Sequence, residues 1–407
     1  MKSISKKVIA GLLVGATSLS VWAPSSEAAT LEKNQYYSIH LNNNLEKVWN
    51  VSAESTGDDR AILLYNGKRG DNEQFVFFQL DDGAYAIVNK NSGKTVSVGP
   101  RAWFGTATAN RVMSGESLLQ RSWTGGSAEK WNLRNQGSNK YEIVNQGNGK
   151  VASYKWEGSL VDNVEYAELA ESNPSDPNKV FNISKNPFGL ENFSVPGLPN
   201  LEYNTFSMPN LPATGTRPNA PDYNQAGPID QQLPQTSESV VVGASLIPCI
   251  MVKDNNASDY TKIHNSPYYT LVKEEYWEKV RSEIIPAGST SKYTIRSGVS
   301  TVDQQKMTDT LSMNFGADLG LKFGQQSANL KASITKTLQT EVSKTSTDSK
   351  EETEEKTIAG VPGKNTGFTA YQLVTKYTLK RTDGSVVSDS WSVRDKNQTL
   401  LRTIPNN

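Results

Sequence analysis

The chain has 407 residues, of which 36% are hydrophobic and 21% are charged. This composition excludes a largely disordered chain and a membrane protein with many spans, and the length fits two domains of ordinary size. Lys plus Arg and Asp plus Glu are equal at 42 each, so there is no overall basic charge to attract nucleic acid.

Residues 1–28 have the pattern of a secretory signal peptide. Three lysines precede the apolar stretch Val8–Trp22, and Ser26 and Ala28 are the small residues that a cleavage site requires. We expect cleavage before Ala29 and a secreted mature chain. After this segment no stretch approaches about 20 continuous apolar residues, so the sequence predicts no transmembrane helix.

The first half of the chain repeats itself. Segments 73–98 and 129–154 align without a gap at an offset of 56 residues, and a third copy is divided between Phe181–Ile183 and Tyr37–Val48. Each unit has short strands between turns rich in Asn, Gly and Asp. Three such units predict a β-trefoil, since a β-propeller needs more of them. We assign residues 29–184 to this domain.

These repeats resemble the ricin-B-type lectin module, whose repeats carry a Gln-x-Trp signature. In this chain the signature is degraded to Gln74-Phe75-Val76-Phe77, Lys130-Trp131 and Val180-Phe181. The core aromatic residues are retained, which favours the fold. The glutamine occurs only once, which weakens the indication of sugar binding.

A sugar site combines a flat aromatic face with a few fixed polar groups. Three groups of residues in the turns and outer strands fit this description. The alternative is that the asparagines only form turns and the tryptophans only cover gaps between loops. The candidates are Trp49 with Asn42, Asn43 and Asn44; Trp103 with Asn89 and Asn91; and Trp156 with Tyr154, Asn145 and Asn148.

Residues 185–238 form a proline-rich connector. Nine of the eighteen prolines of the chain lie between Pro187 and Pro234, which excludes a helix or a central strand. Recurring Leu, Phe and Tyr argue against a disordered linker. We expect an extended segment packed on the second domain, which we place at 239–407.

The single cysteine, Cys249, lies in the apolar run Leu246–Val252. A secreted chain with one cysteine has no internal disulfide, and its stability must come from packing. We expect Cys249 to be a small buried residue of a strand.

The segment 309–342 has apolar residues at every second position in two arms, which flank the turn Gly324–Ser327. Strand side chains alternate between faces, so each arm has one apolar and one polar face. Pairing Phe323 with Ala328 and Leu321 with Leu330 puts both apolar sets on one face. The predicted membrane-facing residues are Leu311, Met313, Phe315, Ala317, Leu319, Leu321 and Phe323 in the first arm and Ala328, Leu330, Ala332, Ile334 and Leu338 in the second.

Each arm supplies the ~9–11 residues that a membrane-spanning strand needs. A single hairpin would leave unpaired backbone groups in lipid, so several subunits would have to contribute hairpins to one β-barrel pore. The alternative is an ordinary amphipathic hairpin on a soluble sheet. The long arms and the flanks rich in Ser and Thr favour the pore.

Several motifs of the second half carry a family resemblance. They are, in order, Ser245–Pro248, Val252–Asp254, Tyr268–Leu271, Tyr276-Trp277 and the hairpin with its Ser/Thr-rich flanks. This order, behind a trefoil, resembles the Bin-like (Toxin_10-type) insecticidal toxins of spore-forming bacilli, whose pore domain is of the aerolysin type. The resemblance implies an all-β chain, with a β-trefoil followed by an elongated aerolysin-like sheet domain.

The resemblance also implies partners. These are a glycan or glycoprotein receptor on gut cells, the target-cell membrane and further copies of the chain in a pore oligomer. Some members require a second toxin component, and many relatives are deposited in parasporal crystals, whereas this chain has the pattern of a secretion signal.

Two other classes stay open from sequence, a lectin or adhesin without lytic activity and a trefoil-bearing carbohydrate-active enzyme. The sequence has no zinc-protease motif, phosphate-binding loop or nucleophile elbow, and its two histidines, His40 and His264, lie in different halves. We therefore predict no catalytic residue, no metal, no cofactor and no nucleic-acid partner.

Overall fold

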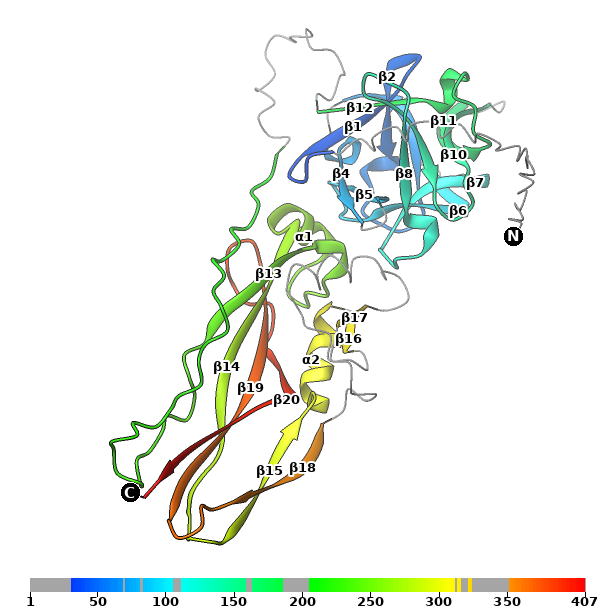
Figure 1. The fold of residues 1–407 in the computed structure, drawn as a ribbon. Coiled ribbons are helices and arrows are strands. Elements are labelled where there is room, and N and C mark those ends of the chain that lie inside the picture. The colour runs from blue at the N-terminus through cyan, green and yellow to red at the C-terminus, as the bar shows by residue number, and fades with distance from the viewer. Residues whose placement is uncertain are drawn as a thin grey trace, which may run out of the picture.

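The structure is a computed structural model that describes residues 31–68, 70–80, 83–104, 111–158, 163–185, 205–311, 313–315, 321–323 and 351–406. These residues form a rounded N-terminal domain and an elongated second domain (Figure 1). The first has a twelve-stranded sheet system and the second is built on a four-stranded sheet. The prediction of an all-β chain with a trefoil ahead of a β-sheet domain is confirmed.

The trefoil is made of short antiparallel strands and single turns of 3₁₀ helix. Its strands are β1 (Tyr36–Leu41), β2 (Asn44–Val51), β3 (Arg60–Asn66), β4 (Phe75–Gln79), β5 (Tyr85–Asn89), β6 (Thr95–Phe104), β7 (Arg111–Arg121), β8 (Trp131–Asn135), β9 (Lys140–Asn145), β10 (Val151–Gly158), β11 (Asn163–Ala170) and β12 (Phe181–Ser184). Its 3₁₀ turns are η1 (Ser52–Glu54), η2 (Asp71–Glu73), η3 (Ser127–Glu129) and η4 (Pro177–Lys179).

The three sequence repeats meet in one core. The turns η2, η3 and η4 are followed by strands that begin at Phe75, Trp131 and Phe181, and these three side chains are fully buried. They pack in a single cluster with Phe77, Leu133 and Ile183. The shared core predicted from the repeated apolar pairs is therefore confirmed.

The second domain is a long twisted sheet with an added ribbon. Its elements are β13 (Val240–Pro248), η6 (Cys249–Met251), α1 (Asp259–Asn265), β14 (Tyr268–Ile285), β15 (Thr290–Ser297), α2 (Thr301–Leu311), β16 (Met313–Phe315), β17 (Leu321–Phe323), β18 (Glu352–Ala359), β19 (Thr366–Lys380) and β20 (Trp391–Pro405). The main sheet has the order β13-β14-β19-β20, and β15 pairs with β18 in a separate antiparallel ribbon.

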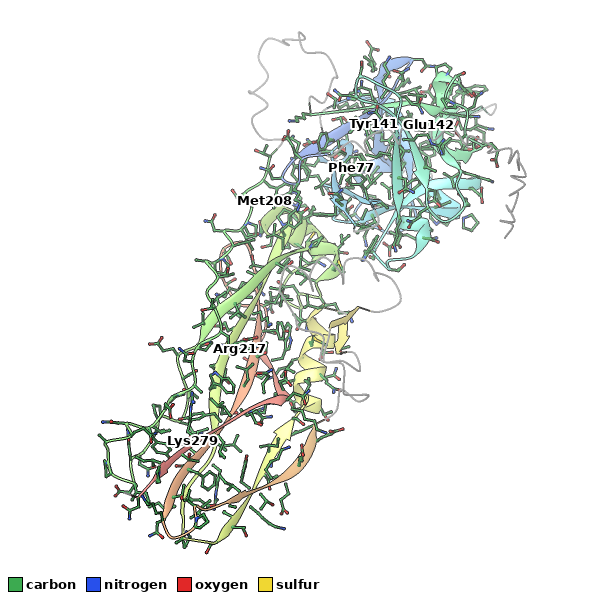
Figure 2. All side chains as sticks on the ribbon, in the orientation of Figure 1. Phe77, Tyr141, Glu142, Met208, Arg217 and Lys279 are labelled. Carbon is green, nitrogen blue, oxygen red and sulfur yellow. The ribbon has the colours of Figure 1, made fainter. Side chains whose placement is uncertain are left out.

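Residues 205–239 lie extended along this domain (Figures 1 and 2). They contact it by backbone and side-chain bonds. The amide of Lys279 donates to the carbonyl of Gln235 (2.8 Å), and the indole N–H of Trp277 donates to the carbonyl of Pro218 (2.9 Å). Arg217 forms an ion pair with Glu275 (2.7 Å). The proline-rich segment thus supplies carbonyl acceptors to the sheet although its prolines have no N–H to donate.

The part of the main sheet that is far from the trefoil is covered on both faces. Adjacent strand residues point to opposite faces, and Tyr371 packs with Tyr223 and Leu233 of the extended segment. Its neighbour Ala370 packs with Ile358 of the ribbon. Burial on both sides explains why β19 carries a nearly continuous run of buried residues.

The two domains share an apolar core. Val76 and Phe78 of the trefoil belong to the same buried cluster as Cys249, Tyr268 and Trp391 of the second domain. The rings of Phe78 and Tyr268 meet edge to face at 5.2 Å. Burial raises the pKa of the Cys249 thiol to about 12. The prediction of a small buried cysteine is confirmed, but its placement in a strand is wrong, because β13 ends at Pro248 and Cys249 begins η6.

The first arm of the predicted hairpin is different in the structure. Leu311 is the last residue of α2 rather than the first residue of a strand. The Oγ of Ser300 accepts the Asp303 amide (3.1 Å) near the start of this helix, and Met307 and Leu311 join the shared core. For this folded state, the prediction of a strand beginning at Leu311 is therefore wrong, because the packed helical turn buries Met307 and Leu311.

In the described part of the predicted hairpin, the strand pairing also differs from the predicted one. Strand β16 pairs antiparallel with β17, so that Met313 is opposite Phe323 and Phe315 is opposite Leu321. The predicted continuous arm thus doubles back on itself here. The other predicted membrane-facing residues, Ala317, Leu319, Ala328, Leu330, Ala332, Ile334 and Leu338, lie outside the described residues. Over the described ranges, no helix is both long and apolar enough to cross a bilayer.

Candidate functional site

The first sugar candidate, Trp49, is a core residue. Its indole is fully buried and meets Phe75 and Phe181 edge to face, at centroid distances of 6.2 and 5.5 Å. A sugar ring cannot reach it, so the prediction for Trp49 is wrong. The asparagines grouped with it lie at the start of β2 and just before it, whereas strand alternation turns the Trp49 side chain into the trefoil.

Two predicted asparagines are also buried and form turns. Asn89 donates to the carbonyl of Asn72 (3.0 Å), and Asn145 donates to the carbonyl of Ala128 (3.0 Å). The side-chain oxygen of each accepts an amide two residues further on. Sugar contact by Asn89 and Asn145 is therefore wrong. The same turn chemistry recurs in two of the three lobes of the trefoil, which are residues 44–94 (first), 95–150 (second) and 151–184 with 31–43 (third).

The remaining candidates are at least partly accessible. Trp103 and Trp156 are 41% and 55% exposed, and the Tyr154 hydroxyl donates to Glu165 (2.9 Å). Asn44 and Asn148 accept amides of their own turns, Asn91 donates to the Glu54 carbonyl, and Asn42 has its amide bonded to Val180. Sugar contact by these residues stays a prediction.

A pocket of about 360 Å³ lies elsewhere, on the first lobe of the trefoil, between β2, η1, β3 and η2. None of its lining residues was among the sequence candidates. Its polar and aromatic lining includes Asn50, Glu54, Tyr65, Lys68, Asn72 and Glu73.

The lining combines one accessible ring with fixed polar groups. Tyr65 is 50% exposed, and the Lys68 ammonium is 5.4 Å from the centre of its ring. The buried Glu73 carboxylate accepts from Asn50 Nδ2 (3.0 Å) and from the Lys68 amide (2.9 Å). Asn72 donates to the Val51 carbonyl (3.2 Å). An aromatic face beside oriented amide and carboxylate groups is the arrangement that a saccharide requires.

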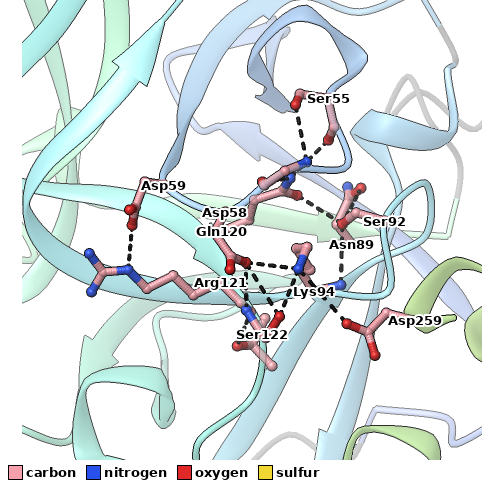
Figure 3. A network of polar contacts seen from close by, with 12 residues as sticks. Ser55, Asp58, Asp59, Asn89, Ser92, Lys94, Gln120, Arg121, Ser122 and Asp259 are labelled. Carbon is pink, nitrogen blue, oxygen red and sulfur yellow. Dashed lines mark hydrogen bonds and ion pairs between the residues drawn. The ribbon is translucent and has the colours of Figure 1, made fainter. Parts of the chain in front are cut away.

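One wall of the pocket has an unusual backbone. Ala53 and Glu54 have positive φ angles of 58° and 52°, in the left-handed region that non-glycine residues rarely adopt. Asn91 Nδ2 donates to the Glu54 carbonyl (2.8 Å), and Gln120 Nε2 donates to the Ser55 carbonyl (2.8 Å). Figure 3 shows Gln120 reaching Ser55 and Ser92 at the centre of this network. Such strained conformations persist where surrounding bonds determine them, and they cluster at ligand sites.

The other two lobes lack the aromatic residue. Tyr65 is ten residues before Phe75, and the corresponding positions before Trp131 and Phe181 are Arg121 and Glu171. Arg121 forms an ion pair with Asp59. The signal that could have located the pocket is therefore a comparison of the three repeats ten residues ahead of the core aromatic.

The described residues contain no group of three His, Cys, Asp or Glu side chains that could hold a metal ion. The pocket presents a ring, amides, a carboxylate and an ammonium group, which are groups suited to noncovalent recognition.

Two sequence families match the chain. The family described as Insecticidal Crystal Toxin, P42 matches residues 240–405, and the family described as Ricin-type beta-trefoil lectin domain-like matches residues 22–110.

Three similar proteins come from two bacteria. Binary larvicide subunit BinA of Lysinibacillus sphaericus is 27% identical over 342 residues, 83% of this chain and 82% of that protein. Binary larvicide subunit BinB of the same organism is 27% identical over 361 residues, 87% of this chain and 75% of that protein. Insecticidal crystal protein Cry35Ab1 of Bacillus thuringiensis is 23% identical over 362 residues, 84% of each chain.

The crystal structure of Cry35Ab1 has the same fold. It superimposes with a TM-score of 0.72 at 20% identity and covers 92% of this chain and 90% of that one. The shared architecture therefore extends over both domains.

Proposed function

This chain belongs to the Bin-like insecticidal toxin family, and from that premise we propose that it binds a saccharide on a target cell and then permeabilises the cell membrane. The first lobe of the trefoil is the saccharide-binding part. The segment 311–342 is the membrane-inserting part. The observation that carries the first half of the proposal is the pocket in which Tyr65, Asn50 and Glu73 converge.

Replacing Tyr65 tests the saccharide site. We expect Tyr65→Ala to weaken binding to the best ligand of a glycan array by about tenfold or more, because truncating a central aromatic contact typically costs at least that much. The affinity is measured by titration calorimetry. The matched control is Trp156→Ala, which removes an equally exposed aromatic residue of the trefoil. Loss of binding in the control but not in Tyr65→Ala would move the site to the third lobe.

The register of the ribbon supports the membrane segment. In the pair of β15 and β18, Ser297 is opposite Glu352, so the intervening chain leaves and returns at one end of a single ladder. Continuing that register puts Leu319 opposite Leu330 and Phe315 opposite Ile334. It leaves Gly324-Gln325 as a two-residue turn, and glycine in the first position suits a type II′ hairpin turn.

The faces of such a ladder agree as well. On β15 the side chain of Ile295 is buried, whereas Lys292 and Arg296 are exposed. Because strand residues alternate, the apolar positions of both arms continue the Ile295 face. The register differs by two residues from the one inferred from sequence, in which Leu321 was opposite Leu330. A two-residue shift keeps every side chain on its face.

The proposal requires several copies of the chain. A lone hairpin in lipid has unpaired N–H and C=O groups on both edges, so hairpins from neighbouring subunits must close a ring. Two relatives are named as subunits of a binary larvicide. We therefore propose that a second protein component is a partner of this chain. It is to be added to the dye-release assay if the single chain is inactive.

Dye release from liposomes and gut-membrane vesicles tests membrane permeabilisation. Leu319→Arg is expected to lower release by at least about tenfold, since Arg on a lipid-facing strand costs ~2–4 kcal/mol per subunit at mid-membrane. Ser333→Arg puts the same charge on the polar face and should leave release largely intact. Equal release by both variants would contradict the proposed orientation. Saccharide binding without release, alone or with a second component, would instead support a lectin.

A further inference from the structure

We propose that helix α1 of the second domain holds the walls of the saccharide pocket of the trefoil in place, through contacts outside the pocket itself. This inference rests on the proposed saccharide binding and adds residues outside the trefoil to it. In Figure 1 α1 lies at the end of the second domain that faces the trefoil. The seven residues of this helix touch the trefoil at three points, and two of these points support the walls of the pocket.

The first point is the N-terminal residue of α1. Gly93 of the trefoil has a φ of +71°, and a Cβ at this position would be 2.2 Å from the Asp259 carbonyl oxygen. The backbones are thus in direct contact. Lys94 Nζ lies 3.8 Å from the Asp259 carboxylate and also bonds to Asp58 (2.8 Å) and Ser122 (2.7 Å), as Figure 3 shows.

The second and third points lie at the other end of the helix. The buried Tyr36 hydroxyl donates to the Ile263 carbonyl (3.0 Å). His264 Nε2 is 3.6 Å from the Asp71 carboxylate, which also accepts Lys90 (2.8 Å). Asp71 is the first residue of η2, the turn that carries Asn72 and Glu73 into the pocket.

The turn held by Asp259 is bonded to both pocket walls. Within that turn, Asn91 donates to the Glu54 carbonyl (2.8 Å) and Asn89 donates to the Asn72 carbonyl (3.0 Å). Glu54 and Asn72 both line the pocket. On one side, the turn 89–93 lies between α1 and the pocket. On the other side, His264 contacts Asp71, which precedes the pocket residue Asn72.

The second lobe supplies an internal comparison. Its equivalent turn has Asn145 in place of Asn89 and Gly149 in place of Gly93, with a similar φ of +74°. A Cβ at Gly149 would meet nothing within 4 Å. The lobe whose turn rests on α1 is thus the lobe with the exposed Tyr65, whereas the second lobe has Arg121 at the corresponding position.

This arrangement makes Asp259 and His264 positioning residues, because neither lines the pocket. We expect both residues to act by ordering the pocket walls before the saccharide binds. A wall that is held in its strained conformation before the ligand arrives binds more tightly than one that must be ordered on binding.

The matched pair Gly93→Ala and Gly149→Ala tests the proposal in the full chain. Both introduce the same methyl group at a positive φ, so both should lower the melting temperature through backbone strain. Only Gly93→Ala pushes against α1. We expect it to raise the saccharide dissociation constant about fivefold or more, with Gly149→Ala close to wild type. Equal affinities in the two variants would overturn the proposal.

A milder variant covers the case in which Gly93→Ala does not fold. Asp259→Asn combined with His264→Gln removes the Asp259 carboxylate and the His264 imidazole and leaves side chains of similar size. We expect about a two- to fivefold rise in the dissociation constant, in the range measured for partly exposed ion pairs. An unchanged dissociation constant in this double variant would also overturn the proposal.

Hydrogen exchange separates this proposal from the one on which it rests. Amides in 52–59 and 70–74 should exchange faster in Gly93→Ala than in Gly149→Ala without any saccharide present. If wild-type protein binds no saccharide, the proposed function fails, and the exchange result still decides the role of α1. Equal exchange in both variants would contradict bracing by the helix.

Discussion

A disulfide between positions 313 and 323 is expected to abolish membrane permeabilisation, and reduction is expected to restore it. Met313 is directly opposite Phe323 in the described structure. Cα atoms of opposite residues in an antiparallel pair are about 4.5–5.5 Å apart, which suits a disulfide. In the proposed membrane ladder Met313 would instead be opposite Lys336. The cross-link therefore holds the first arm in the doubled-back form, and the two arms cannot pair.

The control places a second disulfide where no rearrangement is proposed. Thr294 and Glu355 are opposite each other in the ribbon, and both are exposed. They stay opposite in the extended ladder, so Thr294→Cys with Glu355→Cys should release dye under oxidising and reducing conditions. The native Cys249 is buried and should not exchange with either pair. Full release by the oxidised 313–323 variant would show that this pairing persists during permeabilisation.

Replacing Trp391 by alanine is expected to lower the free energy of unfolding by ~3–5 kcal/mol, the usual range for removing a buried tryptophan. The indole is fully buried and stacks on Tyr377 at an interplanar angle of 19°. Among the described residues its Nε1 has no hydrogen-bond partner, so the loss is one of packing. The total stability of a domain is about 5–15 kcal/mol, so the change is a large part of it.

The effect should extend to both domains, because Trp391 belongs to the core that also contains Val76 and Phe78 of the trefoil. Urea denaturation followed by circular dichroism measures the change. Val386→Ala, at an exposed position in the loop that leads to Trp391, is the control and should stay within about 0.5 kcal/mol of wild type. A loss below about 1 kcal/mol for Trp391→Ala would contradict the role of this core.

The trefoil could be predicted because its core is repeated in the sequence. Phe75, Trp131 and Phe181 occupy equivalent positions, and each begins a strand with one residue between it and the end of a 3₁₀ turn. The direction of a single side chain was harder to infer. Trp49, which follows a run of three asparagines along the chain, has the same local pattern whether it faces the core or the solvent, and only the register of β2 decides between them.

The pocket was missed for a related reason. Asn50, Tyr65 and Glu73 are far apart along the chain, and each resembles an ordinary strand or turn residue on its own. They converge only when β2, β3 and η2 are folded together. Helix α2 was missed because alternation from Leu311 onward is consistent with a strand, whereas Met307 and Leu311, four residues apart, have the spacing of a helix face.

The direction of the β15–β18 ribbon has a consequence for how the molecule would stand on a cell. In Figure 1 the β15 arrow points toward the end occupied by the trefoil, and α2, β16 and β17 lie between the two. Extending each arm from the ribbon to Gly324 adds about 26 residues, or about 85 Å, against a trefoil about 40 Å across. The hairpin tip would therefore pass the trefoil and meet the surface to which the trefoil is tethered. The height of the saccharide above the bilayer then sets how deep the tip can reach.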